Sequence, residues 1–156
     1  MLLSRNGRSP VAHPAAAIAG SAQVVGDVSI GAECYVDYNA VIASAGPPIV
    51  LEDRVIVLAN AVIRSTGGIA RPAFPVRIGA DSLISPLCAL AGCTIGRGCY
   101  VAPGAVILQG ATLGDGARVG VGAIVHAGAD VPAGGRVGLR HVAVPTAAGV
   151  LITPDP

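Results

Sequence analysis

The chain has 156 residues, which favours a single domain, and its formal net charge at pH 7 is +1. Hydrophobic residues make up 53% and charged residues only 12%, so we expect other copies of the chain to cover part of its surface. The sequence has no basic run that would favour nucleic acid or an anionic membrane as a partner. It also lacks a signal-peptide core or an apolar stretch of roughly 18 residues that could span a membrane, so we expect a cytoplasmic protein.

Aliphatic residues recur every six positions from Ile18 onward, after a leading segment, 1–17, without this pattern. A period of six matches neither the 3.6 of an α-helix nor the 2 of a simple strand. It is typical of a short strand followed by a tight turn, with three such units closing one triangular coil. The aliphatic positions are Ile18, Val24, Ile30, Val36, Ile42, Leu51, Val57, Ile63, Ile78, Ile84, Leu90, Ile95, Val101, Ile107, Leu113, Val119, Val125, Val131 and Val137.

The fourth residue after each aliphatic is usually small, which predicts a second inward position near each corner of the coil. These residues are Ala22, Val28, Cys34, Ala40, Ala61, Ser82, Cys88, Cys99, Ala105, Ala111, Ala117, Ala123 and Ala129. Three of the four cysteines belong to this set, so we interpret them as small buried apolar residues rather than as nucleophiles. Disulfides are not expected in a reducing compartment.

Two segments rich in glycine and proline, 43–50 and 64–77, interrupt the repeat and are predicted to leave the coil as surface loops. Insertions in a solenoid often mark its functional face, although neutral loop growth gives the same pattern. The predicted organisation is one domain, 1–156. It has coils over about 18–142 and an irregular tail over 143–156.

The segments 24–42 and 76–125, together with the pair His13-Pro14, resemble the γ-class carbonic anhydrases. The run GCTIG at 92–96 and the five-residue step from Leu90 to Ile95 carry the resemblance most specifically. The resemblance implies an all-β fold, a left-handed parallel β-helix assembled as a homotrimer. The long C-terminal helix of that family is not expected, because prolines recur at the end of the chain.

The resemblance also implies a zinc site between subunits, but its three histidines are replaced. Arg64, Pro86 and Ala91 occupy the three ligand positions, and none of these side chains can bind zinc. The groups that would orient the ligands are replaced as well, by Ala43, Ala45, Leu58 and Ala59. The remaining histidines, His13, His126 and His141, belong to different coils. We therefore expect no metal and no cofactor.

The family geometry would turn the zinc cleft into an apolar pocket between subunits, with Arg64 as its anion or oxyanion anchor. Its expected lining is Ala43, Ile56, Leu58, Ala59, Pro86 and Ala91, and further polar candidates nearby are Asp37, Tyr38, Gln109 and Cys93. The leading hypothesis is a repurposed trimer that acts on or binds a small apolar anionic or carbonyl-containing ligand without a metal. Alternatively, Arg64 forms a salt bridge to Glu52 or Asp53 of a neighbouring subunit.

Two other functions remain open from the sequence. The chain also resembles hexapeptide-repeat proteins in general, and many of these are coenzyme A-dependent acyltransferases. Such enzymes usually place a histidine base at the subunit interface. In that case His126 would be the catalytic residue and 64–77 the extended loop of such enzymes. The third hypothesis is a structural trimer without catalytic activity, a pseudoenzyme.

Overall fold

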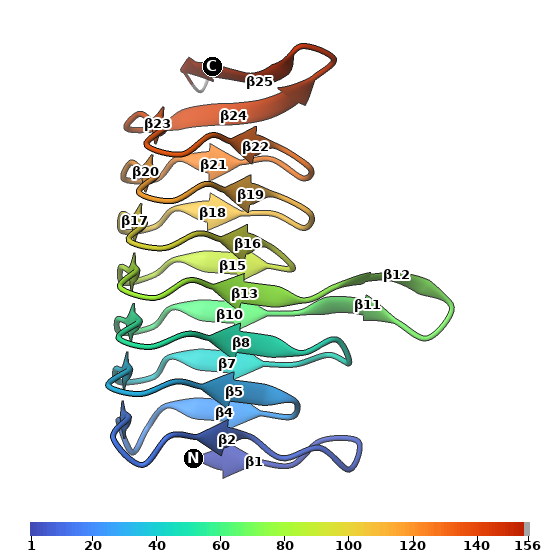
Figure 1. Cartoon of the computed structure of the whole chain (residues 1–156), viewed down its shortest axis with the longest axis vertical. Helices are drawn as coiled ribbons and strands as arrows, with labels where there is room; N and C mark the ends of the chain where they lie inside the picture. Colours follow the sequence, from blue (N-terminus) through green and yellow to red (C-terminus); the bar gives the residue numbers. More distant parts are fainter. Residues whose placement is uncertain (155–156) are drawn as a thin grey trace.

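The computed structural model describes residues 1–154, which wind into an elongated three-sided coil (Figure 1). Sheet A comprises β1 (Leu2–Leu3), β4 (Gln23–Val25), β7 (Val41–Ala43), β10 (Val62–Arg64), β15 (Ala89–Ala91), β18 (Val106–Ile107), β21 (Ile124–Val125), β24 (His141–Thr146) and β25 (Gly149–Pro154). Sheet B comprises β2 (Val11–Ala12), β5 (Val28–Ile30), β8 (Ile49–Leu51), β13 (Val76–Ile78), β16 (Thr94–Ile95), β19 (Thr112–Leu113) and β22 (Asp130–Val131). Sheet C comprises β3 (Ala17–Ile18), β6 (Tyr35–Val36), β9 (Ile56–Val57), β14 (Leu83–Ile84), β17 (Tyr100–Val101), β20 (Arg118–Val119) and β23 (Arg136–Val137).

Successive strands of each sheet come from successive coils and pair in parallel, except for the final antiparallel pair β24–β25. The predicted all-β fold, a left-handed parallel β-helix without a long C-terminal helix, is confirmed. No helix among the described residues is long and apolar enough to cross a membrane.

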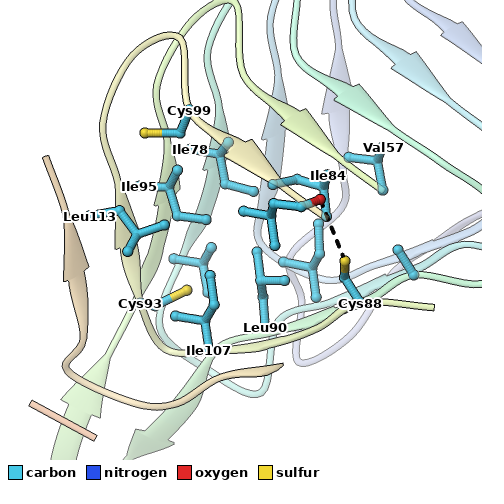
Figure 2. Close-up of a cluster of buried hydrophobic side chains, with 14 of the residues drawn as sticks. Val57, Ile78, Ile84, Cys88, Leu90, Cys93, Ile95, Cys99, Ile107 and Leu113 are labelled. Atoms are coloured by element: carbon cyan, nitrogen blue, oxygen red, sulfur yellow. Dashed lines mark hydrogen bonds between the residues drawn. The ribbon is translucent and has the colours of Figure 1, made fainter. Parts of the chain in front are cut away.

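The core is a stack of aliphatic side chains that runs along the axis of the coil. In sheet A, for example, Ile63 pairs with Leu90, and Leu90 pairs with Ile107. Figure 2 shows such a stack with the thiols of Cys88 and Cys93 packed among the aliphatic chains. The small corner residues are buried as predicted, because a triangular coil leaves little room beside each large aliphatic side chain.

The leading segment is part of the coil. Leu2 of β1 pairs with Val24, and Val11 of β2 pairs with Ser29, so residues before Ile18 already form strands. These strands escaped the prediction because the position six residues before Ile18 holds the small Ala12, and because Leu2, which pairs with Val24, lies outside the six-residue period.

The tail expected to be irregular is an antiparallel hairpin, β24–β25, that covers the C-terminal end of the core. Ala143 and Ile152 pair with each other across the hairpin, and both side chains pack on the core. The prolines that argued against a long helix do not prevent this hairpin, because Pro145 is tolerated in a short strand pair at the end of the sheet.

In both segments that interrupt the repeat, 43–50 and 64–77, fewer residues lie in loops than predicted. Ala43 belongs to β7 and Ile49 to β8, so only residues 44–48 lie between strands. Most of the second interruption is a hairpin of β11 (Thr66–Gly68) and β12 (Arg71–Phe74), which projects from the side of the solenoid (Figure 1).

Candidate functional site

The outer face of sheet A carries an apolar groove of about 250 Å³ beside the base of the β11–β12 hairpin. We call it the sheet A groove. It is lined by Val62, Arg64, Thr66, Ala89, Leu90, Ala91, Val106 and Leu108. Three adjacent coils, those of β10, β15 and β18, supply these residues, so the parallel register of sheet A builds the groove directly.

Three of the predicted site residues meet on this face. Arg64 pairs with Ala43 on the preceding coil and with Ala91 on the following one. Arg64 is exposed, and it takes part in no salt bridge within residues 1–154. Glu52, offered above as its partner in a neighbouring subunit, is already engaged by Arg77 of its own chain. Asp53 accepts a hydrogen bond from the backbone N–H of Ala32 at 2.8 Å.

The other predicted lining residues lie around a corner of the same chain. Ile56 is on sheet C, and Leu58, Ala59 and Pro86 lie on turns between sheets C and A. The six predicted lining residues are therefore split between two faces and could meet only across a contact between chains.

Asp37 and Tyr38 occupy the same corner on an earlier coil. The Asp37 carboxylate accepts hydrogen bonds from the Tyr35 hydroxyl at 3.1 Å and from the Tyr38 backbone N–H at 2.8 Å. The carboxylate raises the pKa of Tyr35, chiefly through this hydrogen bond. Asp37 therefore has a local structural role in the turn, and Gln109 likewise lies exposed on a turn, at the edge of sheet A.

The three histidines stay apart, as their places in the repeat indicated. His13 accepts a hydrogen bond from the Ala15 N–H at 3.1 Å, and His141 Nδ1 lies 2.8 Å from the Leu139 carbonyl oxygen. Among residues 1–154, no group of three or more His, Cys, Asp or Glu side chains could hold a metal ion.

His126 differs from the other two because it lies on the outer face of sheet A. It directly follows the inward residue Val125, which pairs with Ile107 below and with Ala143 above. In the same register His126 lies beside Leu108, which lines the sheet A groove, and Val144. Its exposed imidazole makes no hydrogen bond with the described residues and extends the line of the groove by about 5 Å, one strand spacing.

The hairpin is fixed against the same coils through Phe74. A Cβ atom built on Gly92 would lie 2.4 Å from the Phe74 Cβ, and one built on Gly110 would lie 3.4 Å from the Phe74 ring. The Thr66 hydroxyl is buried at the base of the hairpin and has no hydrogen-bond partner in the described part of the chain. Sequence reasoning missed Thr66 and Leu108. Leu108 could have been found, because it stands eighteen residues, one full coil, before His126.

All four cysteines are buried, and their surroundings disfavour the thiolate form. Burial raises the pKa of the Cys93 thiol to about 12, and it also raises the pKa of Cys34, Cys88 and Cys99. Cys88 donates a hydrogen bond to the Ala102 carbonyl oxygen at 3.1 Å. A thiolate is the reactive form of cysteine, and this environment disfavours it.

A larger open hollow of about 730 Å³ lies on sheet B, toward the N-terminal end. Several charged groups at this hollow are already paired. Arg54 donates two hydrogen bonds to Asp81, at 2.6 and 3.1 Å, and these lower the Asp81 pKa. Arg77 is paired with Glu52. With these groups engaged, the hollow is a weaker candidate for a site than the sheet A groove.

Residues 75–109 and 92–127 match the family model described as "Bacterial transferase hexapeptide (six repeats)". No curated protein matches the sequence. Among solved structures, a candidate acetyltransferase of Bacillus cereus aligns over 99% of this chain and 82% of its own, with 23% identity and a TM-score of 0.77. A hexapeptide transferase family protein of Anaplasma phagocytophilum aligns over 99% and 84%, with 20% identity and a TM-score of 0.57. The UDP-N-acetylglucosamine O-acyltransferase of Moraxella catarrhalis aligns over 92% and 72%, with 15% identity and a TM-score of 0.62.

These comparisons support hexapeptide repeats and the β-helix fold, but they give no support to a carbonic-anhydrase assignment. The interpretation as a carbonic-anhydrase-like trimer repurposed around Arg64 is wrong: the matches are to a transferase repeat and to structures named as acetyl- and acyltransferases. Much of the similarity in segments 24–42 and 76–125, which carried the resemblance, consists of the six-residue period and the small corner residues that the coil itself imposes. They therefore do not distinguish one branch of these proteins from another.

Proposed function

We propose that this protein is an acyltransferase that moves a short acyl group from coenzyme A to an amine or hydroxyl of a small acceptor. The observation that carries the proposal is the position of His126. This exposed imidazole stands at the end of the sheet A groove, within the stretch that matches the transferase repeat. Acyl transfer from a thioester needs a base in such a position, and histidine is the commonest one.

In the proposed reaction His126 first takes up a proton from the acceptor and then gives a proton to the leaving group. The neutral imidazole accepts the proton of the acceptor's amine or hydroxyl as that group attacks the thioester carbonyl carbon. The new C–N or C–O bond forms, the C–S bond breaks, and the imidazolium returns the proton to the departing thiolate. The products are the acylated acceptor and free coenzyme A, and no further reactant is needed.

The sheet A groove suits the thioester end of such a donor. Its walls are mostly apolar, which fits a short acyl chain and the arm that carries it. The buried Thr66 hydroxyl offers a hydrogen-bonding group that the described residues leave unused. The adjoining hairpin would limit access to the groove from one side.

We infer that the site is completed in a homotrimer. The outer row of sheet A is apolar from Val41 through Val62, Val106 and Ile124. The corner between sheets C and A carries the exposed apolar residues Tyr38, Leu87, Val121 and Leu139. A face that meets a different patch of the next copy closes into a ring of three when the rotation between copies is a third of a turn, and such a ring would cover the sheet A groove with a partner's corner.

The test is thiol release from acetyl-coenzyme A by the purified protein, across a panel of amino- and hydroxyl-bearing small molecules. We expect His126→Asn to lower kcat by about 10²- to 10⁴-fold, because the base is lost, while the KM for acetyl-coenzyme A stays within about threefold. The protein's own thiols are buried, so their contribution to the signal is small.

Gln109→Ala, an exposed change on a neighbouring turn, is the matched control and should keep the wild-type rate. Sedimentation checks that both variants keep the wild-type oligomeric mass, and a 15.2 kDa monomer would contradict the inferred trimer. An unchanged kcat in His126→Asn would exclude His126 as the base. No turnover with any acceptor, together with no binding of coenzyme A, would exclude the proposed activity.

A further inference from the structure

Tyr100, Arg118 and Arg136 lie directly above one another on the outer face of sheet C. The register of β17, β20 and β23 pairs Tyr100 with Arg118, and Arg118 with Arg136. Adjacent strands are about 4.8 Å apart, so the two arginine side chains leave neighbouring coils from directly paired positions. All three side chains are exposed, and β23 is the last strand of its sheet.

The two arginines are not neutralised by the fold. Four salt bridges occur among residues 1–154, and neither Arg118 nor Arg136 takes part in any of them. Like charges directly opposite each other on neighbouring strands destabilise a sheet. By contrast, Arg54 and Arg77 on the N-terminal coils each have a carboxylate partner. An anion bound from solution would remove the repulsion that the chain leaves in place.

A groove of about 290 Å³ runs beside the two arginines. Its floor includes Gly120 and Gly138, and a Cβ atom on Gly120 would lie 2.7 Å from the carbonyl carbon of Gly138. The close stacking of the two backbones therefore keeps side chains out of the floor. At the open end, the His141 ring packs against Gly138, since a Cβ there would lie 2.9 Å from His141 Nδ1. A hollow flanked by two arginines without a carboxylate partner among the described residues suits a small anion.

The geometry points to a binding site for a phosphate-bearing ligand, with Arg118 and Arg136 holding a phosphate or diphosphate group. The planar guanidinium fork binds phosphate oxygens with two parallel hydrogen bonds, and two forks one strand apart can hold one phosphate or two linked ones. Tyr100, at the other end of the row, can donate its hydroxyl proton to a phosphate oxygen or pack against the organic part of the ligand.

The experiment is titration calorimetry of the intact protein with four probes: sodium phosphate, sodium pyrophosphate, coenzyme A and dephospho-coenzyme A. We expect pyrophosphate or coenzyme A to bind, and the Kd to rise at least tenfold in the double variant Arg118→Ala/Arg136→Ala. If coenzyme A and dephospho-coenzyme A bind with equal affinity, the arginines hold the diphosphate that both molecules contain. If dephospho-coenzyme A binds more weakly, the arginines hold the phosphate that only coenzyme A carries. Arg5→Ala, which removes one exposed positive charge at the opposite end of the solenoid, should leave the Kd unchanged.

A second variant separates lost binding from lost folding. Arg136→Glu places a carboxylate opposite Arg118, so it should abolish binding and raise the Tm at low salt. The inference is overturned if no probe binds the wild type, or if the double variant binds as tightly as the wild type. It is also overturned if the double variant falls apart into monomers, which would make the arginines subunit contacts. Because pyrophosphate carries no acyl group, His126→Asn should bind it normally, and a failure of the acyl-transfer proposal would leave this result intact.

Discussion

At the scale of single residues, the six-residue period predicted which side chains point inward and which point outward. Cys34, Cys88 and Cys99 are buried at the corner positions that the repeat assigned to them. The period could not tell which outward residues are functional. An exposed polar side chain is equally compatible with solvent, with a bound ligand and with a partner chain. Arg118 and Arg136 were therefore overlooked, although their spacing of eighteen residues already places them on neighbouring coils.

The buried thiols predict a pH dependence of stability. Burial raises the pKa of Cys93 from 9.0 to about 12, so between these values the unfolded chain loses a proton that the folded chain retains. Folding stability should therefore fall as the pH rises from 9 toward 12, and the Tm measured by circular dichroism should fall with it. Cys93→Ala should flatten this decline, and an equally steep decline in the variant would contradict the assignment to Cys93.

At the scale of elements, the parallel ladders followed from the repeat, whereas both hairpins were missed. β11 and β12 are short and contain Gly67, Gly68 and Pro72, residues that sequence reasoning assigns to loops. Their pairing depends instead on a tertiary contact, the packing of Phe74 over Gly92 and Gly110. Phe74 stands eighteen residues before Gly92, the spacing of one coil, but the assignment of 64–77 to a loop outside the repeat hid this relation.

This contact predicts different outcomes for two otherwise similar substitutions. Gly92 and Gly98 both have positive φ, +52° and +61°, so an alanine at either position should cost about 1–3 kcal/mol of backbone strain. Only Gly92→Ala also collides with Phe74, whereas a Cβ on Gly98 meets open space. We expect limited elastase digestion after Ala70, between β11 and β12, to be faster in Gly92→Ala than in Gly98→Ala. Equal rates in the two variants would show that Phe74 does not hold the hairpin in place.

At the scale of the whole molecule, the solenoid turns distance along the chain into position along an axis. Residues eighteen positions apart become neighbours, which brings Leu108 beside His126 at the end of the sheet A groove and stacks Tyr100, Arg118 and Arg136 on another face. The fold was predictable because each coil repeats the same spacing. The site was not, because the period gives the same outward position to every residue of this row and does not tell which of them line a groove.

The most direct test of the central claim, acyl transfer at His126, is alkylation by bromoacetyl-coenzyme A followed by tryptic peptide mapping. The reagent places an electrophilic carbon where the acyl group would lie, and a nitrogen of the imidazole displaces its bromide. Cleavage after Arg118 and Arg136 releases peptide 119–136, which contains His126 and neither a cysteine nor another histidine. We predict one label on this peptide, protection by excess coenzyme A, and no label in His126→Asn. A label confined to other peptides, or one that coenzyme A does not prevent, would contradict the account.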